Sequence, residues 1–512
     1  MRVYRNEPEM HKAIQSVLEQ TYTNFKYYIL VNDKTMEAVR KYQNQDNRIV
    51  MIQGKEGEGF RTYAKYIAKE NDYVTTIDAD DWYVNTYIEE LLQYAETYQL
   101  DIAACGNFFT DIRGNIIGVR QQIELKWTRG ETGTILGHVY AFFRTIWGKL
   151  LKSQVLLLYD DSRLPKLELY GGYGGDTLFM FNLLYDAERI GILDKVLYCY
   201  RVSETGGTYE LREGRLDSDE LLFDFVEKTL GHLGAISEEA EKFLYVVYGE
   251  AITDTTRLLL SKPMREIERV HKLLYIYQKK KTVELFRRER GGQLDVPQNG
   301  YFAKRLYYII FEKNMKHKLE KSQVNEWQKL FCILFKQWDG KFSPEEFALL
   351  LSKKRMMDAL VEENYTLLYT YLLEELKMLK GQKAVVCLKL LKRFAVGTAL
   401  KFTLYEREYM LEYMELVNCI NQGERGKAFQ LLVGYFQEAD ELPYCAEKLA
   451  ELWVNYAAEI EDVEEFIVAK EVMLEVHLKV GKKEQARQEY EELQQSGVED
   501  TNMRNLYCYL YE

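Results

Sequence analysis

The sequence has little proline, few histidines and no long apolar run, and each shortage excludes a class of protein. Only 6 of the 512 residues are proline, while 47% are hydrophobic and 29% are charged. A disordered or collagen-like chain does not have this composition. No stretch approaches the roughly 18 apolar residues of a membrane span, and the first ten residues lack the apolar core of a signal peptide. We expect an ordered, helix-rich protein that is neither exported nor integral to a membrane.

Cysteine and basic charge are also too sparse or too scattered for several functions. The seven cysteines never form a C-x-x-C pair, which argues against a disulfide framework or a structural zinc site and favours the cytoplasm. The formal charge of -12 repels phosphate backbones, so no nucleic-acid partner is expected. The six histidines are isolated, and there is no P-loop, no complete G-x-G-x-x-G and no Ser-His-Asp order. Histidine catalysis and a histidine-ligated metal are therefore not expected.

The pattern of apolar residues changes near residue 215. Before that point, short runs rich in β-branched or aromatic residues predict strands at 27–31, 73–77, 102–105 and 195–200, and helical spacing predicts helices at 9–21 and 62–69. Alternating strands and helices predict an α/β domain with a mainly parallel sheet over residues 1–215. The remainder is helical in period, and we divide it into 216–330 and 331–512.

The last helical part contains a weak internal echo. Gly481 precedes a helical pattern that includes Ala486 and Tyr490, and Gly423 with Ala428 resembles it. Their spacing is not that of a regular tetratricopeptide array. Degenerate helical hairpins and an irregular bundle both stay open as interpretations.

An acidic run follows one predicted strand directly. Asp78, Asp80 and Asp81 lie in the sequence DADDW after the strand YVTTI. Three carboxylates at one sheet edge repel each other unless a cation lies among them, and hard oxygen ligands suit Mg²⁺ or Mn²⁺. The alternative is a solvated acidic turn, because Asp217-Ser218-Asp219 is also D-x-D but lies in a helical segment that looks exposed.

Two further aspartates complete the candidate site. Asp33 follows the strand YYILV, and ligands of parallel sheets bind beyond the carboxyl ends of the strands. Asp176 follows a glycine-rich stretch and begins an apolar helical pattern. Capping of that helix is the alternative role for Asp176.

Over about the first 210 residues, a series of short motifs resembles the family 2 glycosyltransferases, which are inverting enzymes of the GT-A fold. The motifs occur in the family's order: YRNE at 4–7, SVLEQTY at 16–22, NDKT at 32–35, RTYAKYIA at 61–68, DADDW at 78–82, WGKL at 147–150, Gly175-Asp176 and YCYR at 198–201.

The resemblance implies a role for each matching residue. Asp176 would be the general base, and Asp80, Asp78 and Asp81 would bind Mn²⁺ or Mg²⁺. Asp33 would contact the nucleotide base, and the nucleotide-sugar donor would be bound by Tyr4, Glu7, Asn32, Asp33, Arg61, Asp78, Trp147, Lys149 and Arg201.

Five features depart from the family pattern. Arg5, Asn32, Thr62 and Gly175 replace the usual residues of their motifs, and the first strand is only Met1-Arg2-Val3. Either the start of the domain lies upstream or this copy is degenerate, and we favour the first explanation. A sheet without that strand would expose a neighbour's edge.

Residues 262–321 hold 16 basic against 7 acidic side chains, with aromatic residues between them. Such helices dock on anionic lipid head groups, or they form an ordinary solvated face over a core, which we favour.

We therefore predict a cytoplasmic glycosyltransferase, with a peripheral location at the inner face of the plasma membrane as an option. It would transfer a hexose or N-acetylhexosamine from a donor, expected to be uridine-linked, to a glycan or lipid-linked acceptor in surface-polysaccharide synthesis. A protein acceptor, and an inactive relative that acts as a scaffold, are the alternatives.

Overall fold

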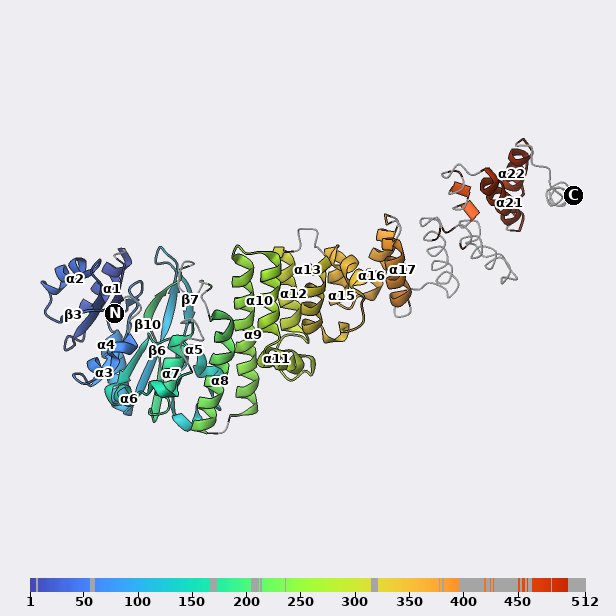
Figure 1. Ribbon diagram of the computed structural model, residues 1–512. Helices are drawn as coiled ribbons and strands as arrows, with labels where there is room; N and C mark the ends of the chain where they lie inside the picture. Colours follow the sequence, from blue (N-terminus) through green and yellow to red (C-terminus); the bar gives the residue numbers. More distant parts are fainter. Residues whose placement is uncertain are drawn as a thin grey trace. The chain divides into compact units, whose positions relative to one another are not determined.

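The computed structural model divides the chain into two units (Figure 1). Unit 1 comprises Met1–Asn314 with Lys329–Lys336, and unit 2 comprises Met315–Gln328 with Gln337–Glu512. The structure describes residues 1–5, 8–55, 60–165, 173–203, 211, 214–234, 236–314, 321–376, 378–379, 382–395, 419, 424, 427, 450–451, 454–455, 458, 463–479 and 481–495.

The first sheet of unit 1 is small and entirely parallel. Its strands are β1 (Arg2–Val3), β2 (Tyr27–Val31) and β3 (Ile49–Gln53), in the order β1-β2-β3. The helices α1 (Pro8–Leu18) and α2 (Met36–Gln43) connect them. All five residues of β2 are buried, as expected for a central strand with apolar side chains on both faces.

The second sheet has seven strands and mixed direction. Its order is β4-β9-β6-β10-β5, with β7 paired to β6 and β8 paired to β10. Strands β4, β6 and β10 run in one direction, and the other four run in the opposite direction. The strands are β4 (Tyr73–Thr75), β5 (Trp82–Tyr83), β6 (Ile102–Thr110), β7 (Ile116–Arg120), β8 (Leu125–Thr128), β9 (Lys149–Lys152) and β10 (Arg189–Arg201).

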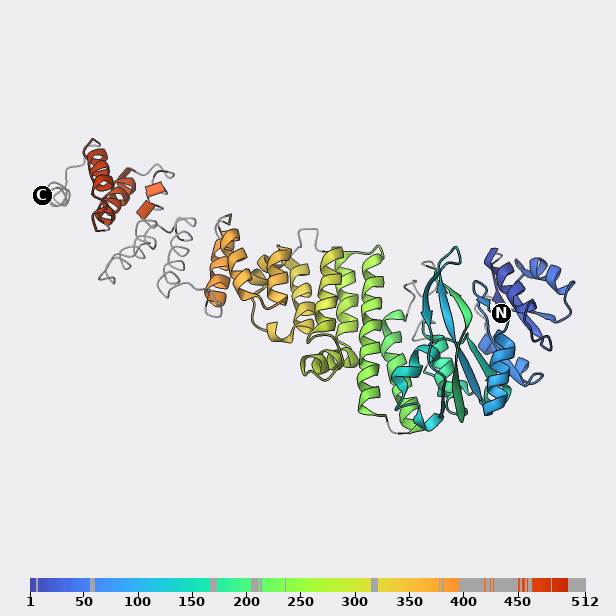
Figure 2. The same cartoon turned by 180° about the vertical axis from the view of Figure 1, so that it is seen from behind.

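Helices cover the second sheet and connect its strands (Figures 1 and 2). They are α3 (Phe60–Ala68), α4 (Tyr87–Tyr98), α5 (Leu136–Phe143), α6 (Ser153–Leu158) and α7 (Gly175–Leu183), with short 3₁₀ turns η1 (Arg129–Glu131) and η2 (Asp161–Arg163).

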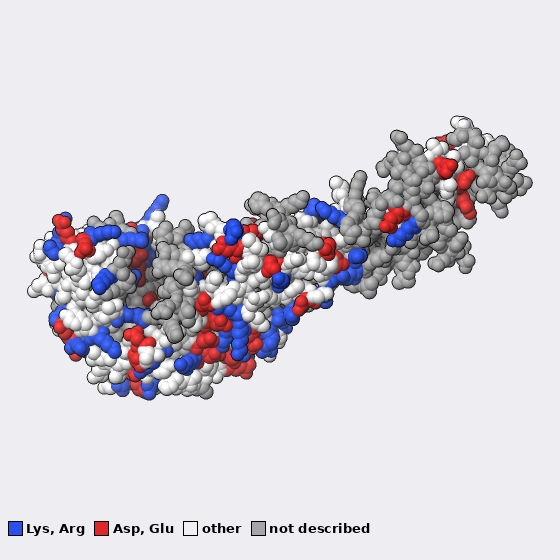
Figure 3. Space-filling view, in the orientation of Figure 1, with Lys and Arg blue, Asp and Glu red and all other residues white. Residues whose placement is uncertain are grey.

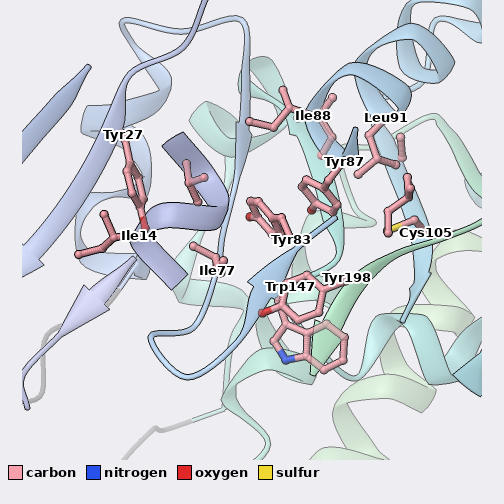
Figure 4. Close-up of a cluster of buried hydrophobic side chains, with 14 of the residues drawn as sticks. Ile14, Tyr27, Ile77, Tyr83, Tyr87, Ile88, Leu91, Cys105, Trp147 and Tyr198 are labelled. Atoms are coloured by element: carbon pink, nitrogen blue, oxygen red, sulfur yellow. The ribbon is translucent and has the colours of Figure 1, made fainter. Parts of the chain in front are cut away.

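Aromatic side chains fill the core between these elements (Figure 4). The rings of Tyr83 and Tyr87 stack with centroids 3.9 Å apart, and Trp147 stacks on Tyr198 with centroids 4.6 Å apart. The hydroxyl groups of Tyr83 and Tyr87 each meet the Thr75 hydroxyl within hydrogen-bond distance. Their polar ends are therefore satisfied inside an apolar core, which is the usual condition for burying tyrosine.

Five long helices follow the sheets within unit 1. They are α8 (Arg215–Leu233), α9 (Glu238–Ser261), α10 (Glu266–Tyr277), α11 (Lys280–Arg290) and α12 (Tyr301–Asn314). Helix α8 packs against both α7 and α9, and both views show it beside the sheet domain (Figures 1 and 2). The expected boundary near residue 215 falls at the start of α8. The expected fold class, an α/β domain followed by a helical region, is confirmed.

The second D-x-D sequence is helical as expected, but the expectation that it is exposed was wrong. Ser218 and Asp219 in α8 are only 0% and 3% exposed. Asp219 faces inward because it pairs with Arg215 one helical turn earlier, and it also accepts a hydrogen bond from Thr255 of α9.

Many basic side chains of residues 262–321 pair with acids of α8 and α9. Lys279 contacts Asp217 and Glu220, Lys281 contacts Asp224 and Glu227, and further pairs join Arg288 to Glu241 and Arg305 to Glu250. Figure 3 shows blue and red side chains interleaved over the helices of unit 1. This arrangement supports the solvated-face interpretation of the basic segment.

The regular secondary structure described in unit 2 is helical. Its helices include α14 (Pro344–Leu351), α15 (Lys354–Val361), α16 (Tyr365–Leu376), α17 (Gln382–Ala395), α21 (Val463–Lys479) and α22 (Lys483–Gln495). The residues of α13 (Lys321–Leu334) and of the turn η5 (Lys336–Trp338) are divided between the two units.

Helices α21 and α22 form the hairpin expected around Gly481. Gly481 has φ +79° in the turn, and Ala486 and Tyr490 bury their side chains against Leu474. The echo at Gly423 and Ala428 lies outside the described residues. None of the helices in the described part of the chain combines the length and hydropathy needed to cross a bilayer.

Candidate active site

A cavity of about 1000 Å³ is lined by residues from both sheets of unit 1. Its walls include Tyr28 and Leu30 of β2 and the whole of β4. Asp78 and Asp176, which lie 98 positions apart in the sequence, both line it. The structure thus brings the acidic run and the glycine-preceded aspartate to one space, as the candidate site requires.

The charges of Asp176 and Asp80 act on Asp78. Water reaches Asp78 through the cavity, but the surrounding protein, followed by the charges of Asp176 and then Asp80, raises its pKa to about 7. The positive charge of Arg2 acts in the opposite sense. A carboxyl group whose pKa is raised by neighbouring carboxylates lies where a cation would be stabilised.

Asp81 differs from its two neighbours because its carboxylate is already engaged. Its side chain is 1% exposed, and its oxygens accept hydrogen bonds from the Tyr198 hydroxyl at 2.6 Å and the Arg201 backbone N–H at 2.8 Å. Burial, followed by the charges of Asp78 and Asp80, raises the pKa of Asp81 well above its usual range. These contacts join the acidic run to β10.

Asp176 lies in the first turn of α7, and the Ile146 N–H donates to its carboxylate at 3.3 Å. The N-cap of α7 is Gly174, and no side chain caps this helix. The carboxylate of Asp176 is therefore directed to the segment before β9 and not to its own helix. Burial raises its pKa above the ordinary value, which makes it a stronger proton acceptor when ionised.

Two arginines line the same cavity. Arg61 of α3 pairs with Asp161 at 3.3 Å, and both side chains line the cavity. Arg2 of β1 also lines it, and its charge lowers the pKa of both Asp78 and Asp176. The family motifs predicted Arg61 but missed Arg2 and Asp161, because neither belongs to a motif.

The structure places the predicted nucleotide contacts Tyr4, Asn32 and Asp33 outside the cavity lining. Asn32 donates to the Tyr4 carbonyl and accepts from the Lys34 and Thr35 N–H groups, which closes the turn after β2. Asp33 accepts from Gln53 at 2.8 Å on the surface. Glu7 lies outside the described residues.

Three more of the predicted donor contacts lie next to the acidic run and support it: Trp147, Lys149 and Arg201. Trp147 stacks between Tyr198 and Tyr200, as Figure 4 shows for Tyr198. The buried ammonium group of Lys149 donates to the Trp147 carbonyl at 2.8 Å, and burial lowers its pKa to about 7. Arg201 pairs with Glu9 of α1 at 2.9 Å.

The loop that carries Asp176 also depends on close packing against α8. Gly174 has φ +74°, and a Cβ atom there would lie 2.3 Å from the Leu222 side chain. We predict that Gly174→Ala lowers the free energy of unfolding by about 1–3 kcal/mol, because the left-handed backbone is strained and Leu222 must move. Denaturant titration measures this change.

Gly292→Ala is the matched control for that prediction. Gly292 also has a positive φ, at +65°, but nothing lies within 4 Å of the position of its Cβ. It carries the backbone strain without the steric contact. Equal losses in the two variants would contradict a packing role for Gly174.

Comparisons with known proteins identify the class of this chain. The family model described as Glycosyl transferase family 2 matches residues 1–155. The uncharacterized glycosyltransferase MJ1057 of Methanocaldococcus jannaschii is 31% identical over 210 residues, which are 38% of this chain and 68% of that protein. The uncharacterized glycosyltransferase EpsJ of Bacillus subtilis is 29% identical over 213 residues, and the glycosyltransferase GlyA of Streptococcus pneumoniae is 28% identical over 221 residues.

The expected class, a glycosyltransferase, is confirmed. The chain belongs to glycosyltransferase family 2, and its first domain has the GT-A fold. The EpsJ and GlyA matches each cover 39% of this chain, and 59% and 30% of those proteins respectively. Among solved structures, S. aureus TarS is 16% identical with a TM-score of 0.31, covering 68% of this chain and 51% of that one.

Proposed function

We propose that unit 1 transfers a sugar from a nucleotide-linked donor, most simply a uridine diphosphate sugar, to an acceptor hydroxyl with inversion. The observation that carries this proposal is that Asp78 and Asp176 line one cavity, with the charge of Asp80 acting on Asp78. The family supports the reaction class. In open α/β sheets, ligands bind beyond the carboxyl ends of the strands, and Asp78 follows β4 in the same way.

A divalent cation fits the acidic run. Asp78 and Asp80 offer hard oxygen ligands. Burial, followed by the charges of Asp176 and Asp80, raises the pKa of Asp78, and a cation would neutralise those charges. Within the described ranges, no group of three or more Asp, Glu, His or Cys side chains is arranged to hold a metal. Mg²⁺ commonly uses one or two carboxylates together with substrate phosphates and water, so two aspartates suffice.

The chain's own residues divide the work around that ion. Asp78 and Asp80 would hold Mn²⁺ or Mg²⁺, which when bound supplies charge neutralisation to the diphosphate leaving group. We assign Asp81 a positioning role because Tyr198 and Arg201 already engage its oxygens. Arg2 and Arg61 add positive charge to the same cavity, which favours binding of an anionic donor.

Asp176 would act as the general base. The Ile146 N–H holds its carboxylate, and its raised pKa strengthens its affinity for the proton of an attacking hydroxyl. Deprotonation of the acceptor on the side opposite the leaving group gives inversion at the anomeric carbon. We place the reaction in surface-glycan synthesis at the cytoplasmic side, and contact of residues 262–321 with anionic membranes stays a prediction.

A donor panel with two readouts tests this proposal. The full chain is incubated with UDP-N-acetylglucosamine, UDP-glucose and UDP-galactose, and release of UDP is measured with Mn²⁺ and with excess chelator. We expect hydrolysis of at least one donor with Mn²⁺ and none with chelator. No release from any uridine- or other nucleotide-linked sugar would contradict the proposal.

Binding of Mn²⁺ is measured separately by the electron paramagnetic resonance signal of the free ion. We expect Asp80→Ala to weaken binding by at least about tenfold, because even groups that only support a metal's ligands contribute that much. Asp194→Ala, which removes an exposed carboxylate from β10, is the control and should bind as the unchanged chain does. Equal binding by the two variants would contradict the assignment of Asp80.

A further inference from the structure

In the described part of the chain, two arginines near the segment that holds Asp176 have no anionic partner. Arg120 ends β7, and Arg144 follows α5. Within the described ranges, neither arginine side chain forms a salt bridge with a carboxylate. This pair, the Arg120–Arg144 pair, belongs to no family motif quoted above. It lies outside the lining of the cavity that holds Asp78 and Asp176.

The position of the pair is fixed by the segment that also holds Asp176. The Thr177 hydroxyl donates to the Arg144 carbonyl at 3.4 Å, and two residues later the Ile146 N–H donates to Asp176. The guanidinium carbon of Arg120 lies 5.8 Å from the centroid of the Trp147 ring, the next residue along. The backbone of Arg144 therefore adjoins the first turn of α7, and the side chain of Arg120 lies near the ring of Trp147, the neighbour of Ile146.

The side chain of Arg120 is half-buried on aromatic faces. Its guanidinium carbon lies 5.2 Å from the Phe109 ring centroid as well as near Trp147. Burial, followed by the charge of Arg144, lowers the pKa of Arg120 to about 10. The charge of Arg120 also acts on Lys149, as does that of Asp176, which places all of these groups in one electrostatic neighbourhood.

Other half-buried arginines of this chain form salt bridges, which Arg120 does not. Each of the following pairs with a carboxylate: Arg48 with Asp46, Arg61 with Asp161, Arg163 with Asp186, Arg201 with Glu9, Arg269 with Glu266, Arg288 with Glu241 and Arg305 with Glu250. Among the described half-buried arginines, Arg120 alone pairs with no carboxylate. The charge with the largest effect on its pKa is that of another arginine, Arg144.

Partly desolvating a guanidinium group without an anion has a cost, and a second arginine nearby increases it. An anionic ligand removes that cost. The planar guanidinium group donates two parallel hydrogen bonds to a phosphate or a carboxylate.

We propose that the Arg120–Arg144 pair binds a phosphate or carboxylate group of the acceptor substrate and so directs an acceptor hydroxyl toward Asp176. This inference rests on the proposed function, because it assumes that Asp176 faces the acceptor. It narrows the acceptor to an anionic glycan, polyol phosphate or phosphate-linked lipid carrier. Under this proposal, a neutral sugar that carries no anionic group is not the acceptor.

Binding of small probes tests the pair without any need for activity. Glucose 6-phosphate, glucuronate and glucose are titrated into the full chain by calorimetry. We expect one or both anions to bind and glucose to bind much more weakly, and the two anions distinguish phosphate from carboxylate. Arg120→Gln and Arg144→Gln should each weaken anion binding about ten- to a hundredfold, the range for hydrogen bonds to charged groups.

Two further variants keep the result interpretable. Arg113→Gln removes an exposed arginine from the same hairpin and should bind the anions as the unchanged chain does. Arg120→Lys keeps the charge but not the planar fork, so its binding should lie between the two extremes. Equal anion binding by the unchanged chain and the Arg120→Gln, Arg144→Gln double variant would overturn the proposal, as would glucose binding equal to that of the anions.

The same experiment separates this inference from the proposed function. Anion binding that depends on the pair supports the subsite even where no donor is hydrolysed. Donor hydrolysis without anion binding supports the catalytic proposal and overturns the subsite.

Discussion

Replacing Asp176 by Asn should lower the rate of donor hydrolysis and of sugar transfer about 10²- to 10⁴-fold, the usual contribution of a positioned general base. Asn has the same shape and retains an oxygen that accepts from the Ile146 N–H, so the start of α7 is preserved. What disappears is the capacity to take a proton. The loss should therefore fall on kcat, with little change in the KM for the donor.

The measurement is UDP release under saturating donor and Mn²⁺, with the donor that the panel identifies. Asp194→Asn is the matched control, because it removes one exposed carboxylate of the same sheet without touching the cavity. Asp176→Glu retains a base and should recover part of the rate. A full rate in Asp176→Asn, together with loss of hydrolysis in Asp78→Asn, would mean that another group accepts the proton.

Local patterns in the sequence were sufficient for the order of the elements. The run YYILV became β2 over the residues predicted, and the run YVTTI became β4 with its last two residues outside the strand. The predicted helix at 62–69 lies within two residues of α3 at both ends. Period and side-chain type decide such elements locally, so one sequence suffices.

The same local patterns could not predict contacts between residues that lie far apart in the sequence. The bond between Tyr198 and Asp81 joins residues 117 positions apart, and only the packing of β10 against β5 brings them together. Nothing local distinguishes Asp81, which is engaged, from Asp80. The unpaired state of Arg120 likewise depends on which carboxylates the fold places elsewhere, so no spacing in the sequence could indicate it.

The two D-x-D sequences also show that the surroundings of a motif depend on residues far from it in the sequence. Asp78 and Asp80 follow a strand; Asp78 lines a cavity together with Asp176, and the charge of Asp80 acts on Asp78. Asp217 and Asp219 lie in α8, where Asp219 is buried and paired. The sequence placed the second of them in a helix as observed, but the burial of Asp219 depends on α9, which supplies Thr255.

That buried pair carries the largest expected effect on stability. The Arg215 guanidinium donates to Asp219 at 2.9 Å, Thr255 of α9 donates to the other carboxylate oxygen at 2.6 Å, and both charged residues are 3% exposed. Arg215→Ala should lower the free energy of unfolding by about 3–5 kcal/mol, because it leaves a buried carboxylate without a counterion. Denaturant titration followed by circular dichroism measures the loss.

Arg257→Ala provides the contrast, because Arg257 and Asp254 form a solvent-exposed pair on α9. Its removal should cost about 0–1 kcal/mol. The double variant Arg215→Met, Asp219→Asn should be more stable than Arg215→Met alone, since Asn accepts from Thr255 but carries no charge. A double variant that is less stable than the single one would contradict the electrostatic explanation.

The same pair connects α8 to the loop that precedes Asp176. The guanidinium carbon of Arg215 lies 3.4 Å from the centroid of the Tyr173 ring, three residues before Asp176. Leu222 of the same helix packs on Gly174. If α8 positions the loop through these contacts, Arg215→Ala should reduce donor hydrolysis even at denaturant concentrations below its unfolding transition, where the variant is still folded. A full rate in the folded Arg215→Ala chain would confine the role of the pair to stability.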